Sequence, residues 1–164
     1  LALRAAGIRC EVVPGVTAAQ GCAAATGVPL THRGLATSVR FITGHCRADT
    51  PLDLDWRGLA DPDTTLVVYM GAASIGDIAG QLMSGGLAGS TPVLAINNGT
   101  LPSERRLVSC LERIAAEAVS ARFMGPVLFI VGRVVSLYAS GEVCPVLQAA
   151  LAAAPVQLEA FAHA

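Results

Sequence analysis

The fold follows from the stretch Thr65-Leu66-Val67-Val68-Tyr69-Met70-Gly71, an apolar run closed by a glycine. Its continuous run of apolar and β-branched residues predicts a strand over 65–70 that is buried on both faces. Directly after it, the spacing of apolar residues predicts a helix over 75–84, capped by Ser74 and ended by Gly85-Gly86. A buried strand followed by an amphipathic helix is typical of a sheet covered by helices.

The same alternation of apolar runs and helical stretches extends in both directions along the chain. Helices are expected over 17–26, over 55–59 with Asp55 as N-cap, and from 111 to about 118. Further strands are expected over 10–13, 38–43, 92–96, 106–110 and 127–131, the last extended past Gly132 by Val134-Val135. Some neighbouring strands are joined too tightly for a crossover connection. We therefore predict an α/β or α+β sandwich with a mixed five- to six-stranded sheet and flanking helices.

The composition limits the classes of protein that this chain can be. Its 164 residues suffice for one domain, and only 14% of them are charged. A surface this poor in charge is expected to be partly covered by a partner subunit or a further domain. The net charge of −1 gives no field that favours nucleic acid. The apolar stretches are far shorter than the ~20 residues of a membrane-spanning helix, so no membrane association is expected.

Neither the cysteines nor the known catalytic motifs indicate a metal or a nucleophile. The five cysteines are odd in number and include no CxxC pair, which predicts a reduced, cytoplasmic protein. His45 stands next to Cys46, but no second Cys/His pair completes a site, so no metal is expected. The chain holds no GxSxG, HExxH, P-loop or GxGxxG motif, and no catalytic residue is assigned. Methyl transfer from a sulfonium, which depends mostly on positioning, fits this absence.

Three junctions that follow predicted strands are candidate ligand-binding segments. The junction 14–19 offers free amides at a helix N-terminus, although it also reads as a plain turn capped by Thr17. Met70, with Gly71, offers a soft apolar contact at a strand end, or simply fills the core. The run 97–100 is either a tight Asn-Gly turn or a backbone loop that binds a nucleoside.

The basic residues are all arginine, because the chain contains no lysine. The guanidinium fork binds carboxylates in a bidentate way, so these side chains suit a polycarboxylate. Surface ion pairs are the alternative interpretation. The candidates are Arg33, Arg40, Arg105 and Arg106.

Four segments in this order resemble one known family. They are 11–19 with 27–33, 38–45, 65–71, and Asn98-Gly99-Thr100 with Arg105 and the run 131–135. Together, from about Leu3 to Leu137, they resemble the uroporphyrinogen-III C-methyltransferases of the tetrapyrrole methylase family. The resemblance implies two α/β domains with S-adenosyl-L-methionine in the cleft between them, and methylation of two pyrrole carbons to give precorrin-2 for sirohaem or cobalamin.

The resemblance also assigns residues and partners. It places Thr17, Ala18, Met70 and Gly99 at the cofactor. The tetrapyrrole substrate carries eight carboxylates, and we extrapolate Arg40 and His45 to the substrate or to the cleft. A homodimer is implied. Gly34 and Asn97 depart from the family pattern, which usually has acidic residues there.

The resemblance divides the chain into three parts. Residues 1–15 are expected to be the end of a missing first domain and the interdomain linker, 16–140 the C-terminal domain, and 141–164 an Ala-rich tail. The chain begins at Leu1, and 1–6 read like the last turns of a helix closed by Gly7. The family's acid/base residues belong to the first domain, so the chain alone is expected to be inactive.

Two alternatives remain open. One is another tetrapyrrole methylase, which acts on a later cobalamin precursor. The other is a non-catalytic module that keeps the dimer contacts and part of the cofactor site.

Overall fold

Five strands form one mixed sheet in the computed structural model, which describes residues 1–45 and 52–139. They are β1 (Ser38–Thr43), β2 (Thr64–Tyr69), β3 (Pro92–Asn97), β4 (Arg105–Cys110) and β5 (Val127–Val131), in the order β1-β2-β5-β3-β4. β1 and β2 are parallel, whereas β5 is antiparallel to β2 and β3, and β4 is antiparallel to β3. The predicted mixed sheet is confirmed, and β1, β2 and β3 all end at the same edge.

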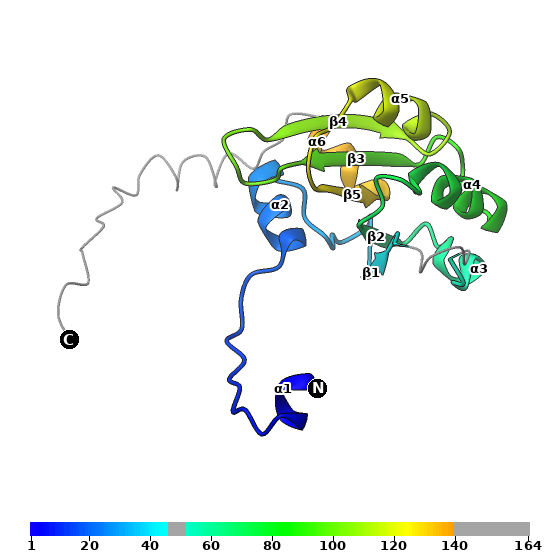
Figure 1. Cartoon of the computed structure of the whole chain (residues 1–164). Coiled ribbons are helices and arrows are strands. Elements are labelled where there is room, and N and C mark those ends of the chain that lie inside the picture. The colour runs from blue at the N-terminus through cyan, green and yellow to red at the C-terminus, as the bar shows by residue number, and fades with distance from the viewer. Residues whose placement is uncertain (46–51, 140–164) are drawn as a thin grey trace.

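Helices cover both faces of this sheet (Figure 1). On one face lie α3 (Trp56–Leu59), α4 (Ile75–Gly85) and α5 (Ile114–Ala121). On the other lie α2 (Ala18–Thr26), the 3-10 helix η1 (Arg133–Val135) and α6 (Ser136–Ala139). β2 shows why both faces are needed: Leu66 and Val68 pack into one core and Val67 into the other, and the first five residues of this strand are buried.

The ends of β1 and β2 approach each other closely at two glycines. A Cβ atom added at Gly44 would lie 2.5 Å from the Gly71 Cα atom. Ser74 occupies the N-cap position of α4 as predicted, but its hydroxyl donates to the Gly44 carbonyl over 2.6 Å instead of capping the helix. Gly71 therefore serves strand packing in this structure.

Three predicted elements differ from the structure. Residues 10–13 are extended but pair with no strand among the described residues, and their apolar side chains are exposed. The short helix α1 (Ala2–Ala5) and the residues up to 17 lead away from the rest of the domain (Figure 1). Strand-forming residues need a partner strand, and the described residues offer none there.

The other two differences concern helices. Val134 and Val135 do not extend β5, because Gly132 adopts a φ of 137° and turns the chain into η1. Both valines are still buried, and a short apolar run fits a strand or a buried helix equally well. α5 begins at Ile114, not at 111. The predicted tail, 141–164, lies outside the described residues.

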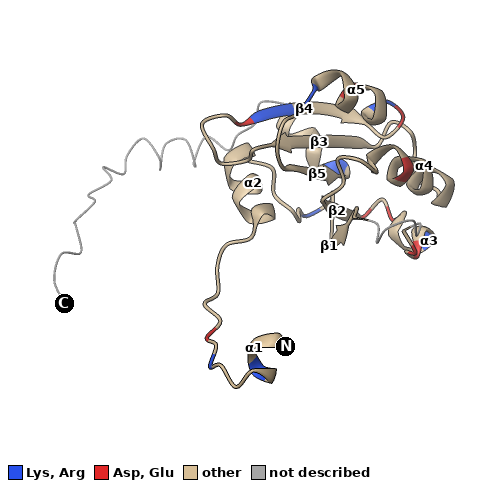
Figure 2. Ribbon diagram, in the orientation of Figure 1, with Lys and Arg blue, Asp and Glu red and all other residues tan. Residues whose placement is uncertain are grey.

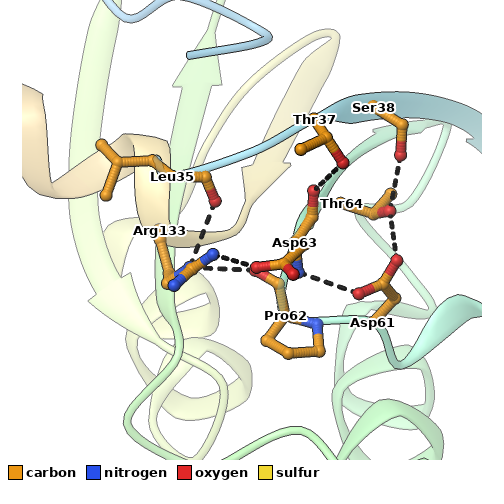
Figure 3. Close-up of polar contacts among 8 residues, drawn as sticks. All are labelled: Leu35, Thr37, Ser38, Asp61, Pro62, Asp63, Thr64 and Arg133. Atoms are coloured by element: carbon orange, nitrogen blue, oxygen red, sulfur yellow. Dashed lines mark hydrogen bonds and ion pairs between the residues drawn. The ribbon is translucent and has the colours of Figure 1, made fainter. Parts of the chain in front are cut away.

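A polar cluster joins β1, β2 and η1 at the sheet edge where β1 and β2 begin (Figure 3). The Arg133 Nε donates to the carbonyls of Leu35 and Pro62 over 3.1 and 3.0 Å, and its Nη2 pairs with Asp63. Asp61 accepts from the Asp63 backbone N–H at 2.9 Å and from the Thr64 hydroxyl at 2.8 Å. These bonds fix the turn that leads into β2.

No helix among the described residues is long and apolar enough to cross a membrane.

Candidate functional site

A cavity of about 480 Å³ opens at the sheet edge where β1, β2 and β3 end. Its volume falls in the range of ordinary small-molecule sites. Ligand sites in open α/β sheets lie at this edge of the strands. Four segments line the cavity: the start of α2, the end of β2 and the residues after it, the loop after β3, and the approach to β5.

The N-terminus of α2 forms one wall. Thr17 is the N-cap residue, and its hydroxyl bonds the Gln20 side chain instead of a helix amide. The Ala19 N–H donates to the Tyr69 hydroxyl at 2.9 Å, which joins α2 to the end of β2. The Ala18 N–H has no hydrogen-bond partner in the described part of the chain. This amide and the helix dipole leave the wall able to receive an acceptor group.

The loop after β3 forms a second wall, which adjoins α2. Asn98 and Thr100 adopt left-handed φ angles of 51° and 70°. A Cβ atom added at Gly99 would overlap the Cys22 Sγ atom and lie 3.2 Å from the Ile96 Cγ2 atom. Gly99 is therefore required by the packing of this loop against α2.

Asn97 holds the third wall in place and was not predicted to do so. Its side chain is 1% exposed, and its Nδ2 donates to the carbonyls of Met124 and Pro126 over 2.9 and 3.1 Å. The Asn98 N–H also donates to Pro126, over 3.0 Å. One feature of the sequence could have indicated this role. Asn97 ends an apolar strand, where a buried side-chain amide needs hydrogen-bond partners. A Glu carboxylate at this position could not donate to these carbonyls.

Met70 stands at the mouth of the cavity with its side chain 63% exposed and a φ of 53°. The other lining side chains are uncharged. Such a wall suits a flat aromatic group and a thioether, with orientation supplied by backbone groups. Its lining contains no carboxylate, imidazole, ammonium or guanidinium group.

Cys22 lines the cavity beneath Gly99. Burial raises the pKa of its thiol, and the Glu104 carboxylate raises it further, while Arg106 acts in the opposite direction. The thiol is therefore protonated at neutral pH and is a poor nucleophile.

The structure brings together three of the four predicted cofactor residues. Ala18, Met70 and Gly99 line the cavity, and Thr17 precedes Ala18 at the helix cap. Arg40 lies elsewhere: its Nη1 donates to the Gly58 carbonyl at 2.7 Å. His45 is exposed just after β1, at the same sheet edge as the cavity but outside its lining.

The remaining predicted arginines make different contacts. Arg33 is exposed, and Arg105 donates to the Ala121 carbonyl over 2.9 Å. Arg106 pairs with Glu104. Among residues 1–45 and 52–139, no group of three or more His, Cys, Asp or Glu side chains could hold a metal ion.

The chain is a mixed α/β domain with helices on both faces of its sheet. An uncharged cavity at the strand ends gives it the form of a ligand-binding domain. Residues 1–115 match the family model of the Tetrapyrrole (Corrin/Porphyrin) Methylases. This chain belongs to that family.

Named relatives are identical to this chain at about half of the aligned positions. The uroporphyrinogen-III C-methyltransferase of Paracoccus denitrificans is 51% identical over 136 residues, which are 83% of this chain and 47% of that protein. The siroheme synthase of Azotobacter vinelandii is 49% identical over 82% of this chain and 29% of its own length. The chain thus spans half or less of these relatives.

A solved structure shares the fold. The uroporphyrin-III C-methyltransferase of Thermus thermophilus, in complex with S-adenosylhomocysteine, is 36% identical, with a TM-score of 0.68. The match covers 82% of this chain and 57% of that one.

Proposed function

We propose that the cavity binds S-adenosyl-L-methionine and its product S-adenosyl-L-homocysteine. The observation that carries this proposal is the convergence of Ala18, Met70 and Gly99, from three distant segments, on one cavity. The Thermus thermophilus enzyme, solved in complex with S-adenosylhomocysteine, supports the same conclusion.

Each wall has a distinct task in this proposal. The Ala18 N–H and the N-terminus of α2 receive an acceptor group of the cofactor, with Thr17 fixing the helix start. Met70 borders the sulfur and the transferred methyl group, and Gly99 contributes backbone on the opposite side. The bound cofactor supplies a methyl group on a positively charged sulfur. The chain's own residues orient it and keep water from the apolar wall.

We further propose that the substrate is uroporphyrinogen III, methylated at two pyrrole carbons to precorrin-2. The names of both relatives, a uroporphyrinogen-III C-methyltransferase and a siroheme synthase, support this assignment. Arg40 and His45 are proposed to serve the substrate or the cleft. The cavity lining contains no carboxylate or imidazole, so no proton-transfer step is assigned to it. Assembly as a homodimer in the cytoplasm belongs to the same proposal.

Calorimetric titration with S-adenosylhomocysteine tests the cofactor site. We expect saturable binding that weakens about tenfold in Met70→Ala, since truncation removes a side-chain contact that the bound ligand would cover. Met124→Ala is the matched control, because Met124 is 78% exposed and lies outside the cavity lining. Equal affinities of the two variants would place the ligand elsewhere.

Turnover is a separate test. Uroporphyrinogen III and S-adenosylmethionine are supplied to two proteins. One is this chain alone, and the other is this chain fused to the part of a relative that it does not cover. We expect precorrin-2 only from the joined protein, because this chain spans about half the length of its relatives and places no carboxylate or imidazole at the cavity. A joined protein that methylates a later corrinoid precursor, but not uroporphyrinogen III, contradicts the assigned substrate.

A further inference from the structure

The loop 98–101 packs against helix α2 where both line the cavity, and an ion pair outside the cavity connects them. Glu104 and Arg106 flank the start of β4, where acidic and basic residues adjoin in Figure 2. One Glu104 oxygen accepts the Thr100 N–H over 2.6 Å, and the other pairs with the Arg106 guanidinium. Arg106 in turn donates to the Ala25 carbonyl, in the last turn of α2, over 2.7 Å.

We propose that Glu104 and Arg106 are positioning residues that hold loop 98–101 against α2 and thereby fix the part of the cavity lining that the loop and the helix form together. The inference about ligand affinity rests on the proposed function, whereas the inference about loop position does not.

The low exposure of Glu104 separates this pair from an ordinary surface ion pair. The Glu104 side chain is only 12% exposed, and that of Arg106 is 32% exposed. Exposed pairs of this kind contribute little, but here each carboxylate oxygen also has a defined partner. Arg106 further stacks over the Tyr138 ring, 5.9 Å from its centroid.

The loop needs such a restraint because of its backbone. Asn98 and Thr100 both adopt left-handed φ angles that side-chain-bearing residues rarely hold without support. Arg106 also supplies the positive charge that favours the C-terminus of α2, whose last turn contains no basic residue of its own. The Glu104–Arg106 pair therefore holds both the loop 98–101 and the C-terminal end of α2.

The same contacts predict a pH response. Burial acts to raise the pKa of Glu104, but the Thr100 N–H and Arg106 outweigh it and the pKa is lowered. The groups that face Glu104 are Thr100 from the loop, Arg106 from β4 and the Cys22 thiol from α2; Tyr138 of α6 faces Arg106. Because the pKa of Glu104 is lowered, the restraint is complete at pH values above the usual pKa of a carboxyl group. It is lost as the pH falls through the lowered pKa of Glu104.

Three variants test the pair. Glu104→Ala removes both contacts, and Glu104→Gln keeps an oxygen that can accept the Thr100 N–H. The control is Glu117→Ala, which breaks the exposed pair of Glu117 with Arg113 on α5, 3.6 Å apart. Arg106→Met is measured as well, so that a poorly folding alanine variant does not decide the outcome.

Two measurements are made. Amide NMR spectra follow Thr100 and the α2 residues 18–22 in ligand-free protein. We expect shifts at both places in Glu104→Ala and Arg106→Met, smaller shifts in Glu104→Gln, which loses the ion pair but keeps an acceptor for the Thr100 N–H, and an acid transition of the Thr100 amide. Calorimetry is expected to show S-adenosylhomocysteine binding weakened about tenfold in Glu104→Ala and Arg106→Met, with a smaller loss in Glu104→Gln and little change in Glu117→Ala.

The outcomes separate the two proposals. If wild type does not bind S-adenosylhomocysteine, the proposed function fails, and the NMR spectra still decide the positioning role. Unmoved amides at 98–101 and 18–22 in both Glu104→Ala and Arg106→Met overturn the positioning pair. So does a binding loss in Glu117→Ala as large as in Glu104→Ala.

Discussion

The Tyr69 hydroxyl oxygen lies 2.9 Å from the Ala19 backbone nitrogen and accepts its hydrogen bond. The two residues are 50 positions apart, and their contact fixes the N-terminus of α2 against the end of β2. One of the helix amides that no backbone carbonyl can reach is thereby satisfied.

Tyr69→Phe removes that acceptor and leaves the ring in place. A part-buried amide is then unpaired, so the free energy of unfolding is expected to fall by about 1–2 kcal/mol. Urea unfolding followed by circular dichroism measures the change. Unchanged stability, together with unchanged amide shifts at 18–20, contradicts the contact.

Gly99→Ala places a methyl group on the Cys22 Sγ atom. We expect a loss of about 1–3 kcal/mol in the free energy of unfolding, as for other overpacked sites. Cys22→Ala removes the sulfur, so the double variant Gly99→Ala/Cys22→Ala is expected to be more stable than the sum of the single changes predicts. A double-mutant cycle by urea unfolding measures this coupling.

Gly80→Ala is the control for that cycle. Gly80 lies inside α4, and a Cβ atom added there meets nothing within 4 Å. Alanine is the better helix former, so a gain of up to about 1 kcal/mol is expected. A loss at Gly80 as large as at Gly99 contradicts the packing explanation.

Arg133→Lys tests the cluster of Figure 3. A lysine ammonium cannot reproduce the guanidinium fork, which spans two carbonyls and the Asp63 carboxylate. We expect Arg133→Lys to be destabilised by about 1 kcal/mol and Arg133→Ala by more. The control Arg57→Ala removes an exposed arginine that has no polar partner among the described residues. Equal effects of Arg57→Ala and Arg133→Ala contradict the role of the fork.

Asp61 predicts an acid sensitivity of the same cluster. The Asp63 N–H first, and then the Thr64 hydroxyl, lower the pKa of the Asp61 carboxyl. A carboxyl group whose pKa is lower in the folded than in the unfolded state stabilises the fold at pH values above its unfolded-state pKa. This stabilisation is lost as the pH falls through the lowered, folded-state pKa. Asp61→Asn and Thr64→Val are expected to flatten the acid dependence of the urea midpoint. A steeper dependence in either variant refutes this origin.

The buried elements were predictable from the sequence, whereas their partners were not. The apolar run 65–70 and the glycine and serine boundaries of α4 placed β2 and α4 nearly to the residue, because apolar spacing and turn residues act locally. The run 10–13 carries the same local signal but has no partner strand among the described residues. Local pattern does not specify pairing.

In the candidate site, too, the local features could be predicted from the sequence and the contacts between distant residues could not. The segments of Met70 and Gly99 were candidates because strand ends and glycine turns can be recognised in a sequence, whereas their assignment to a cofactor came from the family resemblance. The Asn97 amide bonds and the contact of Glu104 with Thr100 join residues whose proximity depends on the completed sheet. Arg40 was extrapolated to the substrate or the cleft, but its guanidinium donates to a carbonyl of α3 away from the cavity. Side-chain chemistry alone did not tell which arginines face a cleft.

The cavity walls come from residues as far apart as Ala18 and Leu128. No shorter stretch of the chain can assemble them, so an intact cavity exists only in molecules whose whole sheet has formed. A small molecule that occupies it draws the folding equilibrium toward the native state by mass action. At a concentration of ligand 100 times its dissociation constant, that linkage amounts to about 2.7 kcal/mol. A thermal-shift screen of nucleoside analogues would therefore report on the folding of the entire domain as well as on affinity.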